Sequence, residues 1–161
     1  MKGRIDISMD SDGSGYAIAK GDNFGARMLK AWLSSDNPDP KSPGAEIETH
    51  AREKRPFAFN GMGNNWGYYQ FEQYLFLRSE TDRQEEMQIL LTAEQALRLL
   101  NDYEKFFAGD RRPTTIEVEF LAAGKEAKQK FEQFSGVELW PPLIQLEDEE
   151  EAAEAAAKGG A

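Results

Sequence analysis

The stretch from Pro56 to Arg78 constrains the fold most, because eight of its residues are aromatic. Side chains alternate between the two faces of a strand. Read as one strand from Tyr68 onwards, the stretch places a mostly apolar set on one face: Tyr69, Phe71, Gln73, Leu75 and Leu77. The opposite face mixes rings with polar groups: Tyr68, Gln70, Glu72, Tyr74, Phe76 and Arg78. The first face is typical of a surface that packs on a core.

The mixed face has two interpretations. It fits a binding platform that is open to solvent, and it fits a second packing face covered by helices. Gln70 and Glu72 favour the open alternative, because burying an unpaired polar group is costly.

The rest of the chain predicts an α+β fold with about six to seven antiparallel strands and two to three helices. Alternating apolar residues predict further strands at 4–9, 16–19, 46–51, 85–91 and 114–121. Apolar residues at helical spacing predict helices at 23–33, 92–107 and 125–134, with a loop at 34–44. Thr92 and Gln95 form a capping box for the second helix, and Gly109 is expected to end it in the left-handed conformation.

Charge divides the chain into a domain at 1–145 and an acidic tail at 146–161. The formal net charge is −10, and the last sixteen residues hold six acids and one base. Alanine and glutamate favour a helix there, but adjacent like charges oppose it, so we expect a frayed or disordered tail. No apolar run reaches the roughly 18 residues that a membrane helix needs, and no signal peptide is evident. We therefore expect a cytoplasmic protein, in the host cytoplasm if it is viral.

Catalytic chemistry has little support in the sequence. Cysteine is absent, and His50 is the one histidine. Nucleophilic catalysis needs a nucleophile next to a base, and transition-metal sites draw mostly on histidine and cysteine. We expect no enzymatic activity, no metal site and no cofactor.

Binding to single-stranded nucleic acid has more support. Proteins of this class stack bases on aromatic rings and hold phosphates with Lys and Arg. The candidate stacking residues are Trp66, Tyr68, Tyr74 and Phe76. The candidate phosphate ligands are Arg52, Lys54, Arg55 and Arg78.

The order of parts, a β-rich body followed by an acidic C-terminal tail, resembles phage and bacterial single-stranded-DNA-binding proteins. In that family the tail recruits partner proteins and competes with DNA for the basic groove. The matching acids here are Glu147, Asp148, Glu149, Glu150, Glu151 and Glu154. The resemblance implies a non-enzymatic, phage-encoded accessory protein of replication or transcription.

A second hypothesis belongs to another class of function. The acidic balance also fits a protein-binding module, either an inhibitor that mimics the charge of DNA or an adaptor whose tail docks on a basic partner. The even mixture of signs over residues 1–55 argues against a continuous mimic surface.

Overall fold

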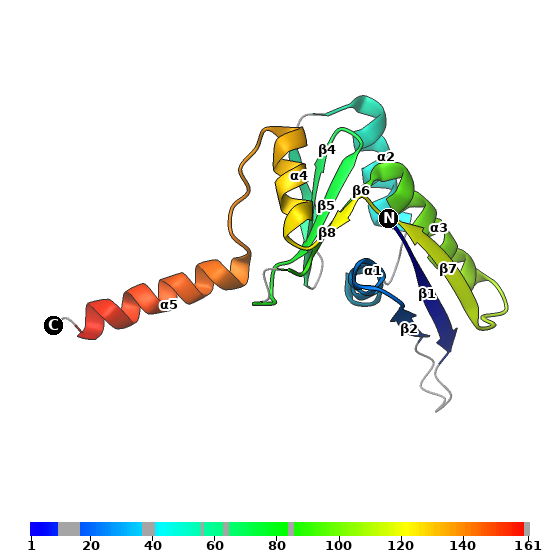
Figure 1. Cartoon of the computed structure of the whole chain (residues 1–161), viewed down its shortest axis with the longest axis horizontal. Coiled ribbons are helices and arrows are strands. Elements are labelled where there is room, and N and C mark those ends of the chain that lie inside the picture. The colour runs from blue at the N-terminus through cyan, green and yellow to red at the C-terminus, as the bar shows by residue number, and fades with distance from the viewer. Residues whose placement is uncertain (10–16, 37–40, 56, 63–64, 84–85, 160–161) are drawn as a thin grey trace.

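The structure is a computed structural model that describes residues 1–9, 17–36, 41–55, 57–62, 65–83 and 86–159. Within these ranges the chain forms five helices and eight strands, and every strand pair is antiparallel (Figure 1). The predicted α+β class is confirmed. The strands are divided between two sheets rather than gathered in one.

The smaller sheet contains β1 (Lys2–Met9), β2 (Ala17–Gly21) and β7 (Thr114–Glu119) in the order β2-β1-β7. The alternation predicted for 114–121 is confirmed, since Ile116 and Val118 are buried while Glu117 and Glu119 are exposed. Residues 10–16, which connect β1 to β2, lie outside the described residues. The strand order places β7 at an edge of this sheet.

The larger sheet has the order β3-β4-β5-β6-β8. Its strands are β3 (Ala58–Met62), β4 (Trp66–Phe71), β5 (Tyr74–Ser79), β6 (Gln88–Thr92) and β8 (Ala122–Ala123). The chain leaves β7 through Phe120 and Leu121, and the Leu121 N–H donates to Leu90 O at 2.8 Å. A single extended segment therefore joins the two sheets.

The single strand predicted at 68–78 is wrong. Residues 72 and 73 form a turn, and β4 and β5 pair as a hairpin with Phe71 opposite Tyr74. Glu72 has φ 50°, a left-handed conformation that the sequence signals only weakly because neither Gly nor Asn stands there. The two-residue turn changes which residues share a face: Tyr69 now lies beside Phe76, and Tyr68 beside Leu77.

The helix predicted at 23–33 is confirmed, and a second helix replaces the end of the loop and the strand predicted between residues 41 and 51. Helix α1 (Phe24–Asp36) begins after Asn23, whose Oδ1 accepts from the Ala26 N–H at 2.8 Å. Helix α2 (Lys41–Glu53) occupies the predicted strand at 46–51. Ile47 and His50, both buried, lie three residues apart and so share one face of α2. The same six residues also alternate Ile47, Thr49 and Ala51 with polar residues, which is the pattern of a strand.

Helix α3 (Ala93–Ala108) carries the predicted capping box, and its apolar stripe is buried. Gly109 follows it with φ −89°, so the left-handed ending predicted there is wrong. Helix α4 (Lys125–Ser135) ends at Gly136, which adopts the left-handed conformation.

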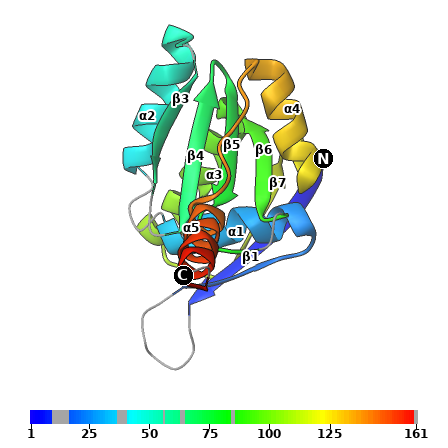
Figure 2. The ribbon, with the colours of Figure 1, turned by 90° about the vertical axis from the view of Figure 1, so that its left-hand side faces the viewer.

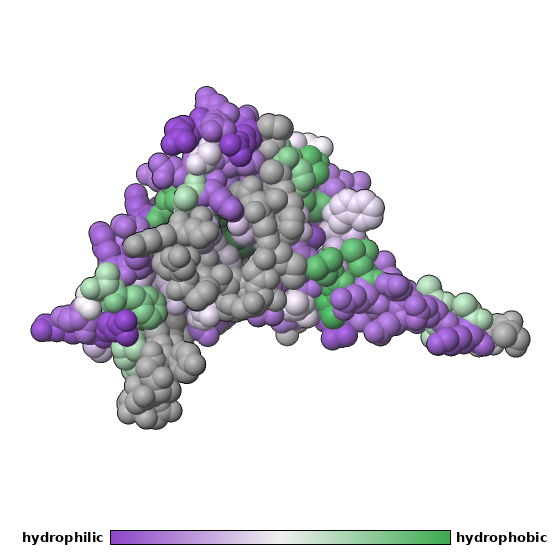
Figure 3. All heavy atoms as spheres, turned by 180° about the vertical axis from the view of Figure 1, so that it is seen from behind, coloured by the Kyte–Doolittle hydropathy of each residue, from purple (hydrophilic) through white to green (hydrophobic). Residues whose placement is uncertain are grey.

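Helix α5 (Leu143–Gly159) is the element that departs most from expectation. Residues expected to be frayed form a helix that extends away from the rest of the chain and has no buried residue (Figure 1). Viewed from behind, this helix appears as a largely hydrophilic arm (Figure 3).

Two hydrophobic cores lie on opposite faces of the larger sheet. The main core lies between the sheets and joins them to α1, α2 and α3. The second core packs Phe76 and Leu90 against Phe131 of α4. Figure 2 shows α4 and α2 flanking this sheet, with α3 behind it. No helix in the described part of the chain has the length and apolar content to cross a membrane.

Candidate functional site

The aromatic residues proposed to stack bases lie mostly inside the protein. Phe76 is fully buried, and its ring stacks on Phe131 with centroids 5.4 Å apart. Tyr74 stacks on Phe134 at 4.3 Å. The expectation that this face is open is therefore wrong, because α4 covers it and occupies the ring faces.

The other two candidate rings belong to the main core. Trp66 is buried, and Tyr68 is half-buried with its hydroxyl donating to Glu46 Oε2 at 2.6 Å. Burial, together with this hydrogen bond, raises the pKa of Tyr68 well above its usual value. Tyr68 and Trp66 therefore link β4 to its surroundings and do not form a stacking surface.

Arg78, predicted to bind phosphate, is only 3% exposed and is engaged by the protein itself. Its Nε donates to Glu80 Oε1 at 2.9 Å, its Nη1 to the carbonyl of Trp140 at 2.6 Å, and its Nη2 to the Tyr69 hydroxyl at 2.8 Å. The second oxygen of Glu80 accepts from the Leu143 N–H at 3.0 Å. The Arg78–Glu80 pair thus fixes the first residues of α5 to the larger sheet.

The basic residues Arg52, Lys54 and Arg55 are exposed at the end of α2. Arg55 Nε donates to Glu53 at 2.6 Å, which partly neutralises this cluster. The aromatic rings proposed to stack bases are covered by other parts of the protein. The three basic residues therefore do not share an exposed surface with them.

The predicted tail acids lie along α5. Asp148 forms an exposed ion pair with Arg83 at 3.1 Å, and the other five are Glu147, Glu149, Glu150, Glu151 and Glu154. Near the base of the helix, Trp140 is 78% exposed.

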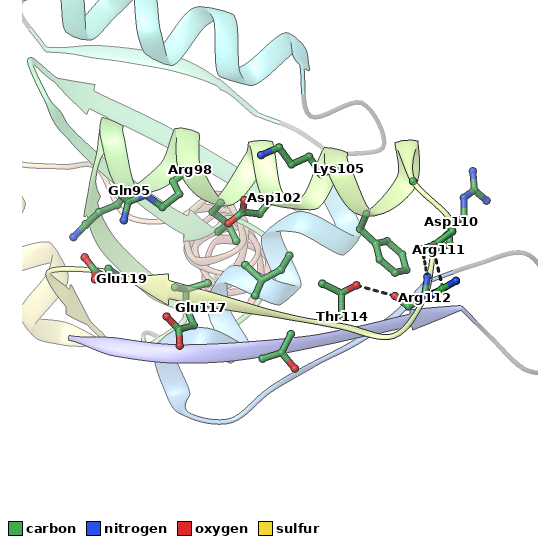
Figure 4. Close-up of a pocket in the computed structure, with 16 residues that line it drawn as sticks. Gln95, Arg98, Asp102, Lys105, Asp110, Arg111, Arg112, Thr114, Glu117 and Glu119 are labelled. Atoms are coloured by element: carbon green, nitrogen blue, oxygen red, sulfur yellow. Dashed lines mark hydrogen bonds and ion pairs between the residues drawn. The ribbon is translucent and has the colours of Figure 1, made fainter.

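A groove lies between α3 and β7 (Figure 4). Its volume is about 470 Å³, and all six residues of β7 line it. A groove that meets every residue of a strand runs along the edge of that strand, where the backbone is exposed.

Hydrogen bonding shows which backbone groups of β7 face this groove. The Met1 ammonium donates to Phe120 O at 2.9 Å, and the Phe120 N–H donates to Met1 O at 3.0 Å. In an antiparallel pair, bonded and non-bonded residue pairs alternate, so Val118, Ile116 and Thr114 are bonded to β1. The N–H and C=O groups of Thr115, Glu117 and Glu119 therefore point away from β1, towards the free edge.

Arg4 supports this assignment independently. It lies opposite Glu117, and both of its backbone groups bond to Asp22 on the β2 side, at 2.7 and 3.0 Å. They are consequently turned away from β7, as the alternation requires.

Helix α3 forms the second wall. Its contributing residues recur every three or four positions and share one face: Gln95, Arg98, Leu99, Asp102, Lys105 and Phe106. Leu99 and Phe106 are buried and give an apolar floor, while the polar residues form the rim. From Gln95 to Gly109 the helix rises about 21 Å, close to the roughly 20 Å of a six-residue strand. The two walls thus match in length.

Charges in the groove are separated by end. Figure 4 shows Gln95, Arg98, Glu117 and Glu119 towards one end, and Asp110, Arg111 and Arg112 at the other. Arg98 pairs with Glu94 at 3.6 Å and Arg112 with Asp110 at 2.7 Å. Among the described residues no ion pair is then formed by Glu117 and Glu119 at the first end, by Asp102 along the middle of α3, or by Lys105 and Arg111 towards the second end.

The sequence predicted both walls of this groove but not the groove. Periodicity alone predicts the helix at 92–107 and the strand at 114–121. The missing information was the strand order, which places β7 at an edge beside α3. No family model, curated protein or solved structure matches this chain.

Proposed function

We propose that this chain is a non-enzymatic protein-interaction module that binds an extended segment of a partner protein along the free edge of β7. The observation that carries the proposal is the outward backbone of Thr115, Glu117 and Glu119, which no described residue pairs and which faces a groove whose other wall is α3. This function falls within the class of protein-binding modules that the acidic composition also suggests.

Strand addition suits this groove physically. An extended segment completes the backbone hydrogen bonds of an edge strand, and alternate side chains enter the pockets beside it. Each new backbone bond contributes about 0.5–1.5 kcal/mol net. Leu99 and Phe106 supply an apolar floor for side chains that point towards α3. The expected complexes are specific and of moderate affinity.

A second copy of the chain does not fit as the added strand. Strands in a sheet lie about 4.8 Å apart, whereas packed helices need about 8–10 Å between axes. α3 is the outer wall of the groove in each copy. If two copies paired through their β7 strands, the α3 helix of one copy would overlap the α3 helix of the other. The groove therefore suits an isolated segment better than a whole domain.

The substitution Glu117→Pro tests the proposal. Proline removes one outward N–H and places its ring on the edge, yet it breaks no bond to β1, so β7 itself should persist. Selection from a displayed random-peptide library should enrich binders of the wild-type protein that lose binding to Glu117→Pro. Glu117→Ala is the matched control, because it removes the same carboxylate but keeps the N–H donor.

Two results would count against strand addition. One is the failure of any peptide to be enriched on a protein that circular dichroism shows to be folded. The other is retention of full affinity by Glu117→Pro among the enriched peptides.

Binding of single-stranded DNA stays a prediction with a weaker physical basis. Its phosphate ligands Arg52, Lys54 and Arg55 are exposed, but Trp66, Phe76 and Arg78 are buried. Titration of labelled oligo-dT with a chain shortened at residue 146 tests this prediction. Binding through phosphate contacts should weaken steeply as the salt concentration rises.

A partner for the acidic helix also stays a prediction. α5 presents its carboxylates on a projecting rod, and the exposed Trp140 lies near its base. Aromatic residues next to charged groups are common anchors at protein interfaces. A partner with a basic surface is the expected counterpart.

A further inference from the structure

The separation of charge along the α3–β7 groove bears on which segments it binds, and this inference rests on the proposed function. We infer that the groove binds a segment running antiparallel to β7, with basic residues near its N-terminal end and an acidic residue about five positions later.

Direction follows from the sheet. β7 is antiparallel to β1, and in an antiparallel addition the N-terminal end of the segment lies beside Glu119. Its C-terminal end then lies beside Thr114 and the turn at Asp110–Arg112. Antiparallel pairs are also more common than parallel ones and slightly more stable per residue.

Charge then distinguishes the two ends of the segment. Glu117 and Glu119 lie beside its first residues and attract basic side chains. Lys105 and Arg111 lie towards its last residues and attract a carboxylate. Reversing the charges along the segment places like charges together at both ends, which weakens binding.

The neighbours of these carboxylates leave them available. Arg4 lies opposite Glu117 on β1, but its side chain pairs with Asp22 at 3.3 Å. Lys2 lies opposite Glu119, and no ion pair joins the two within the described residues.

The strand already paired with β7 has the same charge order. β1 presents Lys2 and Arg4 to Glu119 and Glu117, and then Asp6, whose Oδ1 accepts from the Thr115 hydroxyl at 2.7 Å. The free edge offers the same outward residues to a new strand, so it favours a similar order of charge.

Side-chain alternation sets the spacing. Residues one and three of an added segment share the face of Glu117 and Glu119, whereas residues two, four and six turn towards α3. Apolar residues therefore suit positions two and four, above Leu99 and Phe106. An acidic residue suits position six, on the side of Lys105.

Two synthetic hexapeptides with blocked termini test the inference by fluorescence anisotropy. The forward peptide is Lys-Val-Arg-Val-Thr-Asp, and the second contains the same residues in reverse order. The forward peptide should bind about tenfold more tightly at low salt, and 1 M salt should reduce the difference because it screens exposed charges. The double variant Glu117→Lys/Lys105→Glu should invert the preference. Lys130→Glu, on α4 outside the groove, should leave it unchanged.

The outcomes separate this inference from the function on which it rests. If the two peptides bind the wild type equally and neither binds Glu117→Pro, the inferred charge order is wrong and strand addition is still supported. Tighter binding of the reverse peptide would overturn the direction. Absence of binding by either peptide at millimolar concentration would overturn both proposals.

Discussion

At the scale of single residues, the hydrogen-bonding partners of a charged side chain decide its role. Arg78 shares a sheet face with aromatic rings, which made it a candidate phosphate ligand. In the structure Glu80, Tyr69 and the Trp140 carbonyl occupy its donors. Removing one member of such a buried pair leaves an uncompensated charge and costs about 3–5 kcal/mol. Arg78 is therefore a structural residue that anchors the segment before α5.

Tyr69 provides a prediction about pH. Burial, with the hydrogen bond that its hydroxyl donates to Glu80, raises the pKa of Tyr69 to about 12 from 10.0. A raised pKa means that the folded state favours the neutral phenol. Its contribution to stability should be complete below pH 10 and should disappear as the pH rises through about 12.

Urea unfolding of the wild type and Tyr69→Phe at several pH values measures this contribution. The difference in unfolding free energy should be constant up to pH 9 and shrink above pH 10. Absorbance at 295 nm should show one late-ionising tyrosine fewer in the variant. A difference that grows with pH would contradict the assignment.

At the scale of elements, close packing distinguishes positions that the sequence presents as alike. Gly25 in α1 and Gly44 in α2 are both helical glycines. A Cβ added at Gly25 would lie 2.1 Å from Phe120 Cζ, whereas one added at Gly44 would lie 3.7 Å from Leu97 Cδ2. The Phe120 ring thus packs on the backbone of α1 and brings that helix close to the segment that joins the two sheets.

Alanine at these two positions should have opposite effects. Gly25→Ala should destabilise the protein by about 1–3 kcal/mol through overpacking. Gly44→Ala should stabilise it by about 0.5–1 kcal/mol, because it restricts the unfolded chain without a clash. Chemical denaturation measures the change in unfolding free energy for both variants. A neutral Gly25→Ala would show that Phe120 moves freely.

At the scale of the whole molecule, the two candidate interaction surfaces lie far apart. The α3–β7 groove lies on one side of the sheets, and α5 extends from the other (Figures 1 and 2). The 17 residues of α5 make a rod about 25 Å long. This separation suits an adaptor that holds one partner in the groove and another on the acidic helix.

Removal of residues 143–161 should leave the remainder folded. α5 has no buried residue, and its backbone bonds to the rest of the chain join Leu143 and Ile144 to Glu80. The unfolding free energy should fall by at most about 2 kcal/mol. Arg83→Ala in the full chain, which removes only the exposed pair with Asp148, should cost less than about 1 kcal/mol. Loss of cooperative unfolding in the shortened chain would show that α5 is part of the core.

Local patterns predicted the elements whose stabilising contacts are near in sequence. The capping box at Thr92 and Gln95 lies within one helical turn, and the alternation over 114–121 specifies one buried and one exposed face. The hairpin at Glu72 was missed because its residue types do not demand a left-handed conformation. Helix α2 was missed because its apolar spacing over a short window fits a strand as well.

The sequence by itself determined the α+β class, the capped helix, the exposed charges of the strand at 114–119 and the acidity of the C-terminal segment, because each depends on neighbours a few residues apart. Only the tertiary structure decided that α4 covers the aromatic face, that Glu80 caps α5 from 63 residues away, and that α3 lies beside an edge strand. Those features depend on contacts between segments that are distant in the sequence. The residue pattern of one segment does not specify which other segment packs against it.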